Sequence, residues 1–333
     1  MNYLVTGAAG FIGAHLCAAL KLQGHEVTAI DNFSDYYSPE LKKSRVHNLL
    51  TPTGIKVRNV DLARIEAVSQ VFSESVFEFV IHLAAQPGVR TPLDQSWKYV
   101  RDNVTAFTNV MQNVIQAQIP NFLYASSSSV YGNSQAEKFS EADLGLSPIS
   151  IYGATKLSNE LLASTYTRNS ETKSRGMRFF TVYGPWGRPD MAYFRLLSAA
   201  INDEKFELFG DGEVKRDFTY VGDITSKLIE LSSELKGRPP GFSDVVNIGG
   251  GNPYSLRDLI SIINTQTGTN IKLLERAHNL SDTKFTCSDI TLLSSLTPEH
   301  EFRDLPSGVS ETLAWAKTPG ISNKLASWVA SSI

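Results

Sequence analysis

Three glycines with fixed spacing follow the first apolar run of the chain, and they restrict what the chain can fold into. Residues 2–5 are typical of a buried strand, and Gly7, Gly10 and Gly13 come directly after them, at the start of an expected helix. This spacing allows a tight turn, a close approach of the backbone to a pyrophosphate, and close packing of the helix on a sheet. The loop therefore predicts strand, turn and helix in that order, with phosphate at the helix N-terminus.

An acidic residue stands at the end of the second expected strand. Asp31 and Asn32 follow residues 26–30, with no arginine after them. A carboxylate at this place accepts hydrogen bonds from ribose hydroxyls and repels the 2′-phosphate of NADP, so the pattern predicts NAD as the cofactor. Asp61 and Leu62, after the third expected strand, are placed to contact the adenine, although Asp61 as a plain helix N-cap is an alternative.

Short β-rich runs alternate with helical patterns through the first half of the chain, as in βαβ units on a parallel sheet. Beyond Tyr183 the pattern is less regular. We therefore expect an α/β fold, a Rossmann-like doubly wound parallel sheet with a smaller C-terminal α/β substrate lobe. The NAD-binding domain is expected at 1–182, with a return of the chain to it at about 218–248, and the smaller lobe at 183–333. The expected strands are 2–5, 26–30, 56–60, 79–83, 122–125 and 177–181. The expected helices include a long one at about 93–118 and others near 193–202, 224–235, 256–265 and 309–315.

Composition is that of an ordinary soluble globular protein, with 42% hydrophobic residues and a net charge of -3. This charge gives no reason to expect nucleic acid or an anionic membrane as a partner. No apolar run approaches the roughly 20 residues of a membrane span, and no signal-peptide pattern is present. Cys17 and Cys287 are too few for a disulfide framework or a zinc site, and the histidines show no ligand spacing. We expect no metal and a cytoplasmic location.

A tyrosine and a lysine lie one helical turn apart, after a serine-rich strand end. Ser127 belongs to that strand end, and Tyr152 and Lys156 belong to the expected helix. A tyrosine acts as a base near neutral pH only if its phenolate is stabilised, and a lysine one turn away supplies that charge. The set predicts proton removal from an alcohol, whereas the pair alone would be read as a core aromatic and a solvated lysine.

These motifs together resemble the extended short-chain dehydrogenase/reductase family. The matching segments are GAAGFIG at 7–13, Asp31, HLAA at 82–85, SSSSVYG at 126–132 and YGATK at 152–156. The resemblance implies NAD in the first lobe, a nucleotide sugar in the second, and homodimers formed through two helices of the first lobe. The residues then expected to contact NAD are Gly7, Gly10, Phe11, Ile12, Gly13, Asp31, Asn32, Asp61, Leu62, Leu83, Ala84, Ala85, Asn103 and Ser126, together with Tyr152 and Lys156.

Within that family the chain is most similar to UDP-glucuronate 4-epimerases. Four segments carry this likeness: DNFSDYY at 31–37, QPGVR at 86–90, RFFTVYGPWGRPDM at 178–191 and RDFTYV at 216–221. It implies that Thr181 and Arg188 hold the sugar carboxylate, and a guanidinium fork suits a carboxylate. It also implies that Arg216 contacts the nucleotide diphosphate with help from Arg90. The alternative for Arg188 is a surface arginine that caps a loop. The alternative for Arg216 and Arg90 is an ordinary ion pair between the lobes.

The residues beside Ser127 indicate the type of reaction. Related 4,6-dehydratases carry an Asp-Glu pair where Ser128 and Ser129 stand, and UDP-xylose-forming decarboxylases carry a glutamate at the position of Ser129. With neither carboxylate present, one acid/base suffices: Tyr152 removes the C4 hydroxyl proton, C4 hydride passes to NAD, the 4-keto sugar turns over, and hydride returns to the opposite face. Lys156 is expected to lower the pKa of Tyr152 and Ser127 to orient the C4 oxygen. Ser128 and Ser129 either contact the sugar or are satisfied structural hydroxyls.

The expected activity is thus C4 epimerisation of UDP-glucuronate to UDP-galacturonate. The chain departs from the family pattern at RAHNLSDTK, 276–284, which leaves Arg276 and Lys284 both possible as ligands of the second phosphate. A UDP-glucose/UDP-galactose 4-epimerase, a UDP-glucuronate decarboxylase, a sugar-nucleotide 4,6-dehydratase and a noncatalytic NAD-dependent regulator are the alternatives.

Overall fold

A seven-stranded parallel sheet forms the centre of the larger lobe in the computed structural model, which describes residues 1–89, 93–277 and 285–332. The strand order is β10-β6-β5-β4-β1-β2-β3, and each neighbouring pair is parallel. This confirms the predicted doubly wound sheet. The strands are β1 (Asn2–Thr6), β2 (Glu26–Asp31), β3 (Val57–Asn59), β4 (Phe79–His82), β5 (Asn121–Ser127), β6 (Lys173–Phe179) and β10 (Ser243–Ile248).

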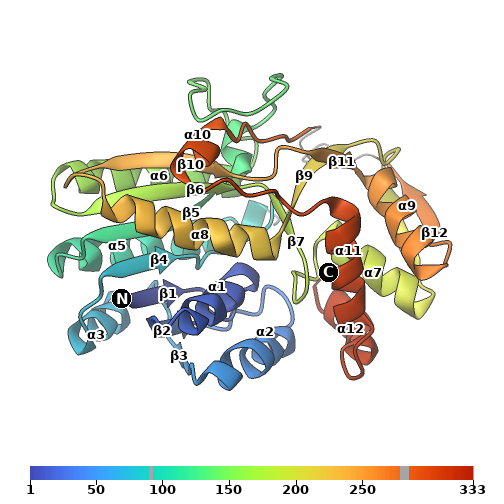
Figure 1. The fold of residues 1–333 in the computed structure, drawn as a ribbon, viewed down its shortest axis with the longest axis horizontal. Helices are drawn as coiled ribbons and strands as arrows, with labels where there is room; N and C mark the ends of the chain where they lie inside the picture. The colour runs from blue at the N-terminus through green and yellow to red at the C-terminus, as the bar shows by residue number, and fades with distance from the viewer. Residues whose placement is uncertain (90–92, 278–284, 333) are drawn as a thin grey trace.

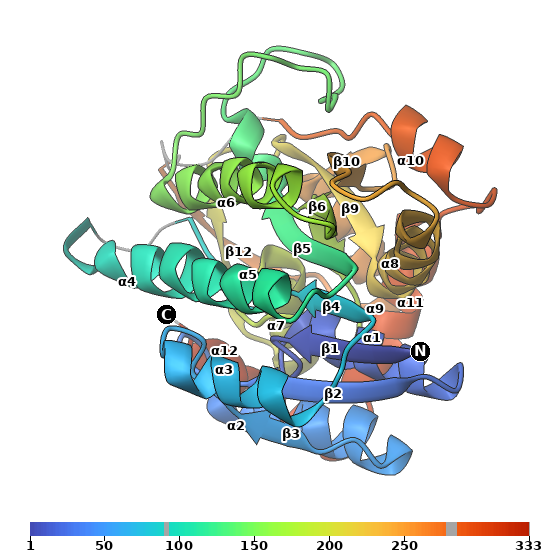
Figure 2. The same ribbon diagram turned by 90° about the vertical axis from the view of Figure 1, so that its left-hand side faces the viewer.

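Helices cover both faces of this sheet (Figures 1 and 2). On one face α1 (Phe11–Leu22) packs against α8 (Val221–Lys236), and α2 (Pro39–Arg45) lies beyond them. On the other face α5 (Ala106–Gln116) lies between α3 (Ile65–Glu74) and α6 (Ile151–Arg168). Both faces are therefore buried, which explains why the strands read as continuous apolar runs.

The long helix expected at 93–118 is interrupted. Its length is divided among a 3-10 turn (Leu93–Gln95), α4 (Trp97–Tyr99), a π-helical turn (Val100–Thr105) and α5. Asn103 lies in the π-helical turn, where its amide exchanges hydrogen bonds with the backbone of Gln86 at 2.7 and 3.1 Å. The wider turn brings this buried amide to the loop after β4, and periodicity alone does not predict that contact.

The strand expected at 177–181 is in fact two strands that belong to different sheets. β6 ends at Phe179, and β7 (Thr181–Tyr183) pairs with β9 (Lys215–Tyr220). Phe180 lies between them and donates its backbone N–H to the Ile248 carbonyl at 3.1 Å. The change of sheet places Thr181 at the junction of the two lobes.

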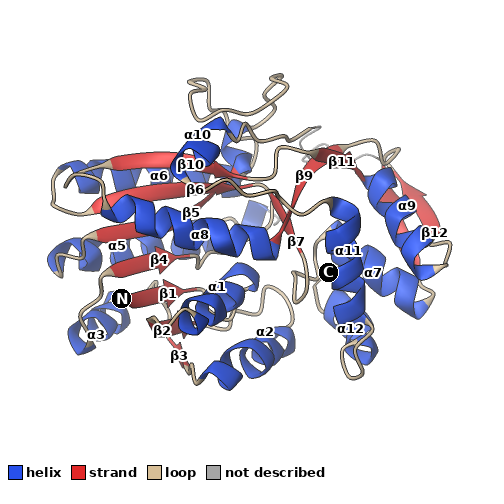
Figure 3. Cartoon of the chain, in the orientation of Figure 1, coloured by secondary structure: helices blue, strands red, loops and turns tan. Residues whose placement is uncertain are grey.

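The smaller lobe combines short strands with helices (Figure 3). It contains a three-stranded sheet, β11-β9-β7, and a two-stranded sheet, β12-β8. The sequence indicated most of its helices but none of its later strands, which are short. Its remaining elements are β8 (Lys205–Phe209), β11 (Pro253–Ser255), β12 (Lys272–Arg276), α7 (Ala192–Asn202), α9 (Leu256–Thr267), α11 (Leu305–Ala316) and α12 (Ser322–Ala330). The short helix α10 (Thr291–Leu296) packs against β10 of the large sheet. The proposed division at residue 182 stays a prediction.

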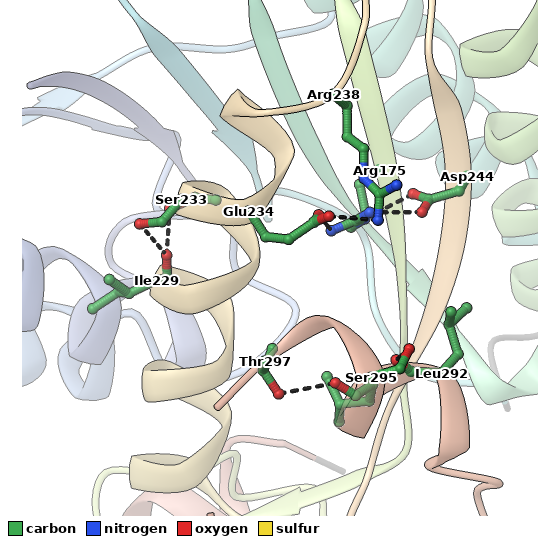
Figure 4. Close-up of polar contacts among 11 residues, drawn as sticks. Arg175, Ile229, Ser233, Glu234, Arg238, Asp244, Leu292, Ser295 and Thr297 are labelled. Atoms are coloured by element: carbon green, nitrogen blue, oxygen red, sulfur yellow. Dashed lines mark hydrogen bonds and ion pairs between the residues drawn. The ribbon is translucent and has the colours of Figure 1, made fainter. Parts of the chain in front are cut away.

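The last strand of the large sheet is attached by a buried arginine near the amino ends of the strands (Figure 4). Arg175 of β6 is fully buried and donates to both carboxylate oxygens of Asp244 on β10, at 2.7 Å each. It also donates to Glu234 of α8 at 2.5 Å. These charge-assisted bonds join β6, α8 and β10, so this end of the sheet is fixed while the opposite end is open for a site. In the part of the chain that the structure describes, no helix is long and apolar enough to cross a membrane.

Candidate active site

A cavity of about 1350 Å³ lies where the carboxyl ends of the large sheet meet the smaller lobe. The strand order reverses between β1 and β4, and open α/β sheets bind ligands at such a switch point. Gly7, Asp31 and Ser126 line the cavity from the sheet, whereas Arg188 and Arg216 line it from the smaller lobe. One cavity therefore collects groups suited to a dinucleotide and groups suited to an anionic second ligand.

The glycine loop is as close-packed as the sequence predicts. Gly7 has a φ of +71°, and a Cβ built on it would lie 2.7 Å from the backbone nitrogen of Ala84. A Cβ on Gly13 would lie 2.1 Å from the Gly7 carbonyl oxygen. The first turn of α1 carries no acidic residue, and its N-cap, Gly10, has no side chain that could occupy the N–H groups. The loop and helix terminus thus fit a pyrophosphate.

The carboxylate of Asp31 is buried at the end of β2 and is fixed by backbone groups. It accepts hydrogen bonds from Ala9 N at 3.0 Å and from Phe33 N at 2.7 Å. Each oxygen retains accepting capacity for a ribose hydroxyl. Lys42 of α2 also lines the cavity, where its Nζ donates to the backbone oxygen of Ser34 at 2.7 Å. Burial lowers the pKa of Lys42 to about 8.

Asp61 and Leu62 both line the cavity, as predicted for contacts with an adenine. The alternative role of Asp61 as a helix N-cap is not what the structure shows, because Arg64 is the N-cap of α3. Asp61 instead accepts a hydrogen bond from Ala63 N at 3.0 Å and pairs with Arg101 of the π-helical turn.

Asn103 is engaged by protein groups, and its predicted contact with the cofactor stays a prediction. Besides its bonds to Gln86, its amide donates to Thr155 Oγ1 at 3.1 Å, and the residue does not line the cavity. It connects the loop after β4 to α6. Every other predicted cofactor contact lines the cavity. Arg90 and Lys284 lie outside the described residues. Arg276 pairs with Glu207 at 2.8 Å and is not among the lining residues, although Glu207 is.

Ser127, Tyr152 and Lys156 come together at the centre of the cavity. Ser127 ends β5, and the first turns of α6, capped by Ser150, carry the other two. The Ser127 hydroxyl hydrogen-bonds the Tyr152 side chain. The Ser127 oxygen also lies 3.1 Å from Ser129 Oγ and accepts from Ser129 N, likewise at 3.1 Å. The Lys156 ammonium lies 5.8 Å from the centroid of the Tyr152 ring. The three side chains are arranged to take a proton from a bound alcohol.

Burial and nearby groups act in opposite directions on the pKa of Tyr152. Burial raises the pKa of Tyr152 above 10.0, while Arg188 and the hydrogen bond with Ser127 lower it and Tyr99 raises it. Lys156 lies beside this ring, is buried and donates to the Ala125 carbonyl at 2.9 Å, and burial lowers its pKa to about 8. Arg188 is thus one cation that favours the Tyr152 phenolate.

The smaller lobe contributes a hydroxyl and two guanidinium groups. Thr181, Arg188 and Arg216 line the cavity together with Ser128 and Ser129, and their contacts with a sugar nucleotide stay a prediction. The Arg188 guanidinium donates to Asp190, from Nε to Oδ1 at 3.1 Å and from Nη2 to Oδ2 at 2.5 Å.

The pair is electrostatically coupled. Burial would raise the pKa of the Asp190 carboxyl, but the Arg188 charge more than offsets this and leaves that pKa below its ordinary value. The residue expected to hold a carboxylate thus already holds one.

Comparison with known proteins decides the family. Residues 3–249 match the model of the NAD dependent epimerase/dehydratase family. The chain belongs to this family. The family assignment accounts for the glycine loop, Asp31 and the three central side chains in a single cavity.

Within the epimerase/dehydratase family, relatives and solved structures are similar over nearly the whole chain. Protein CapI of Staphylococcus aureus is 40% identical over 281 residues, which cover 80% of this chain and 84% of that protein. UDP-glucuronate 4-epimerase 4 of Arabidopsis thaliana is 38% identical over 330 residues, 95% of this chain and 75% of that protein. The structure of UDP-glucuronic acid 4-epimerase from Bacillus cereus, in complex with UDP-glucuronic acid and NAD, is 33% identical with a TM-score of 0.87, covering 95% and 99% of the two chains.

Further charged residues line the cavity and were not predicted from the sequence, among them Lys42, Arg101, Asp190 and Arg195. Asp190 lay inside a segment that was recognised, but nothing in the sequence shows that its partner is Arg188. The other three are ordinary basic residues on helices or a π-helical turn. Among the residues that the structure describes, no group of three or more His, Cys, Asp or Glu is placed to hold a metal ion.

Proposed function

We propose that the protein is an NAD-dependent UDP-glucuronate 4-epimerase, which interconverts UDP-glucuronate and UDP-galacturonate. The observation that carries the proposal is the pairing of two groups in one cavity. The Ser127, Tyr152 and Lys156 set is suited to oxidation at an alcohol carbon, and Arg188 with Thr181 is suited to a carboxylate. The Arabidopsis and Bacillus relatives named for this activity support the substrate.

Tyr152 acts as the general base, because its hydroxyl is held by Ser127 and faces the same cavity as the glycine loop. It takes the proton of the C4 hydroxyl and returns it after the sugar has turned over. Bound NAD supplies the chemistry of hydride acceptance and return at C4. Its positive nicotinamide adds to the charge of Arg188 in favouring the phenolate. Ser127 positions the C4 oxygen.

Arg188 and Thr181 have a second task in this proposal. A 4-keto glucuronate is a β-keto acid and loses carbon dioxide readily when its carboxylate bond aligns with the ketone π system. Two groups that hold the carboxylate out of that alignment protect the intermediate. At positions 128 and 129 this chain has serines, where a dehydratase or a decarboxylase has the carboxylate that its reaction needs.

The test is to incubate the purified protein with UDP-glucuronate, UDP-glucose and UDP-galactose and to follow the products by NMR. We expect C4 inversion of UDP-glucuronate without pentose formation. Tyr152→Phe should abolish turnover, whereas Tyr166→Phe, on the same helix and away from the cavity, should leave it unchanged. Absence of C4 inversion with every sugar would reject the proposal, and pentose as the main product would favour a decarboxylase.

We further propose that the protein is a cytoplasmic homodimer. Its two cysteines, Cys17 and Cys287, are buried free thiols, which suits a reducing compartment. Val100 of the π-helical turn and Leu161 of α6 are exposed apolar side chains on neighbouring elements of the larger lobe. An apolar pair of helical elements at the surface is suited to contact a second copy.

A further inference from the structure

A guanidinium group presents two edges that can each bind a carboxylate through two N–H donors. One edge joins Nε and Nη2, and the other joins Nη1 and Nη2. In Arg188 the first edge is taken by Asp190 through Nε and Nη2. Nη1 has no hydrogen-bond partner among the described residues, and 25% of the side chain is exposed in the cavity wall. The second edge is therefore the one that a ligand can reach.

Asp190 is itself held in place from the other lobe. The Tyr36 hydroxyl lies 3.5 Å from Asp190 Oδ2 and also lines the cavity. The backbone just before Arg188 is fixed by Arg45, which donates to the carbonyls of Trp186 and Gly187 at 2.7 Å each. Because both the carboxylate and the loop are anchored, the direction in which Arg188 points is set before any ligand binds.

We propose that Asp190 is a positioning residue: it occupies the Nε–Nη2 edge of Arg188 and so directs the Nη1–Nη2 edge at the carboxylate of the sugar. This inference rests on the proposed function, and it adds a specificity determinant to it. Asp190 also offsets the Arg188 charge, so what the pair offers a hexuronate is a directed fork rather than a bare cation. A directed fork holds the carboxylate in one orientation and still releases it when the keto sugar turns over.

The experiment compares Asp190→Asn with the wild-type protein. An asparagine side chain offers one acceptor oxygen where Arg188 needs two, and its amide nitrogen faces a second donor. We expect kcat/KM for UDP-glucuronate to fall roughly 10- to 100-fold, the scale of a misplaced binding group. The pentose share of the product should rise. Inhibition by UDP, which has no carboxylate, should not change.

Asp203→Asn is the matched control, because it removes an exposed carboxylate outside the cavity at a positive-φ position that asparagine tolerates. If Asp190→Asn does not fold, Asp190→Glu is the second variant, because it keeps the charge but displaces the carboxylate by one methylene. We then expect a smaller fall in kcat/KM for UDP-glucuronate and a smaller rise in the pentose share. The inference is overturned if Asp190→Asn behaves like the control, if UDP binding weakens as much as UDP-glucuronate binding, or if KM falls without a change in products. A wild-type protein that does not epimerise UDP-glucuronate would instead reject the proposed function.

Discussion

Lys156 shows how a single residue can favour chemistry over stability. It is buried, its Nζ donates a hydrogen bond to the Ala125 carbonyl, and burial lowers its pKa to about 8. An unfolded lysine titrates near 10.4. Between these values the unfolded chain binds more protons than the folded chain, so this residue makes stability rise with pH across that window. At neutral pH the buried charge therefore opposes folding.

We predict that Lys156→Met abolishes epimerisation and stabilises the fold at pH 7. Removing the charge recovers on the order of 3 kcal/mol, less about 1 kcal/mol for the lost hydrogen bond. Thermal melting followed by circular dichroism should show a higher Tm than wild type at pH 7, and the gain should shrink towards pH 10. A Tm that falls at pH 7, or a gain that does not depend on pH, would contradict this account of the site.

At the scale of elements, Arg45 of α2 connects the two lobes through neutral acceptors. It is fully buried and donates to Trp186 O and Gly187 O at 2.7 Å and to the Tyr37 hydroxyl at 2.6 Å. No carboxylate among the described residues forms an ion pair with it. The charge is therefore stabilised by carbonyl and hydroxyl dipoles at the loop that carries Arg188.

We predict that Arg45→Met destabilises the protein by roughly 3 kcal/mol or more, because several buried acceptors lose their donor at once. Turnover should fall as well, since the loop before Arg188 loses its anchor. Urea unfolding gives the first quantity and the NMR assay the second. Lys43→Met, an exposed change on the same helix, is the control. Equal stability of the two variants would show that α2 does not hold this loop.

The elements also show what the sequence could predict. Alternating strands and helices were enough for the parallel sheet, and motif spacing was enough to collect Ser127, Tyr152 and Asp31 at one end of it. The sequence patterns could not predict contacts between side chains that are far apart in the sequence. The sequence does not show that the Asn103 amide bonds Gln86 and Thr155. The partner of Arg188 was hidden for the same reason, since a hydrogen bond depends on rotamers that no pattern encodes.

At the scale of the whole molecule, Val100 and Leu161 form an exposed apolar surface on the larger lobe. Val100 and Leu161 are 52% and 65% exposed, on elements that pack against each other and cover one face of the large sheet. Burying such side chains in a twofold interface is worth about 1.5 to 3 kcal/mol each, and each one occurs twice in a symmetric dimer. A charge placed there should be buried without a partner and should oppose association.

We therefore predict that wild-type protein is a dimer by light scattering and that Leu161→Arg is a monomer at the same concentration. Leu22→Arg is the matched control, because Leu22 is 80% exposed at the end of α1, which packs on the opposite face of the sheet. This variant should remain dimeric. A wild-type monomer would remove the dimer from the proposal. A dimer that survives Leu161→Arg would move the interface to another surface. Epimerisation by the Leu161→Arg monomer would show that association is not needed for catalysis.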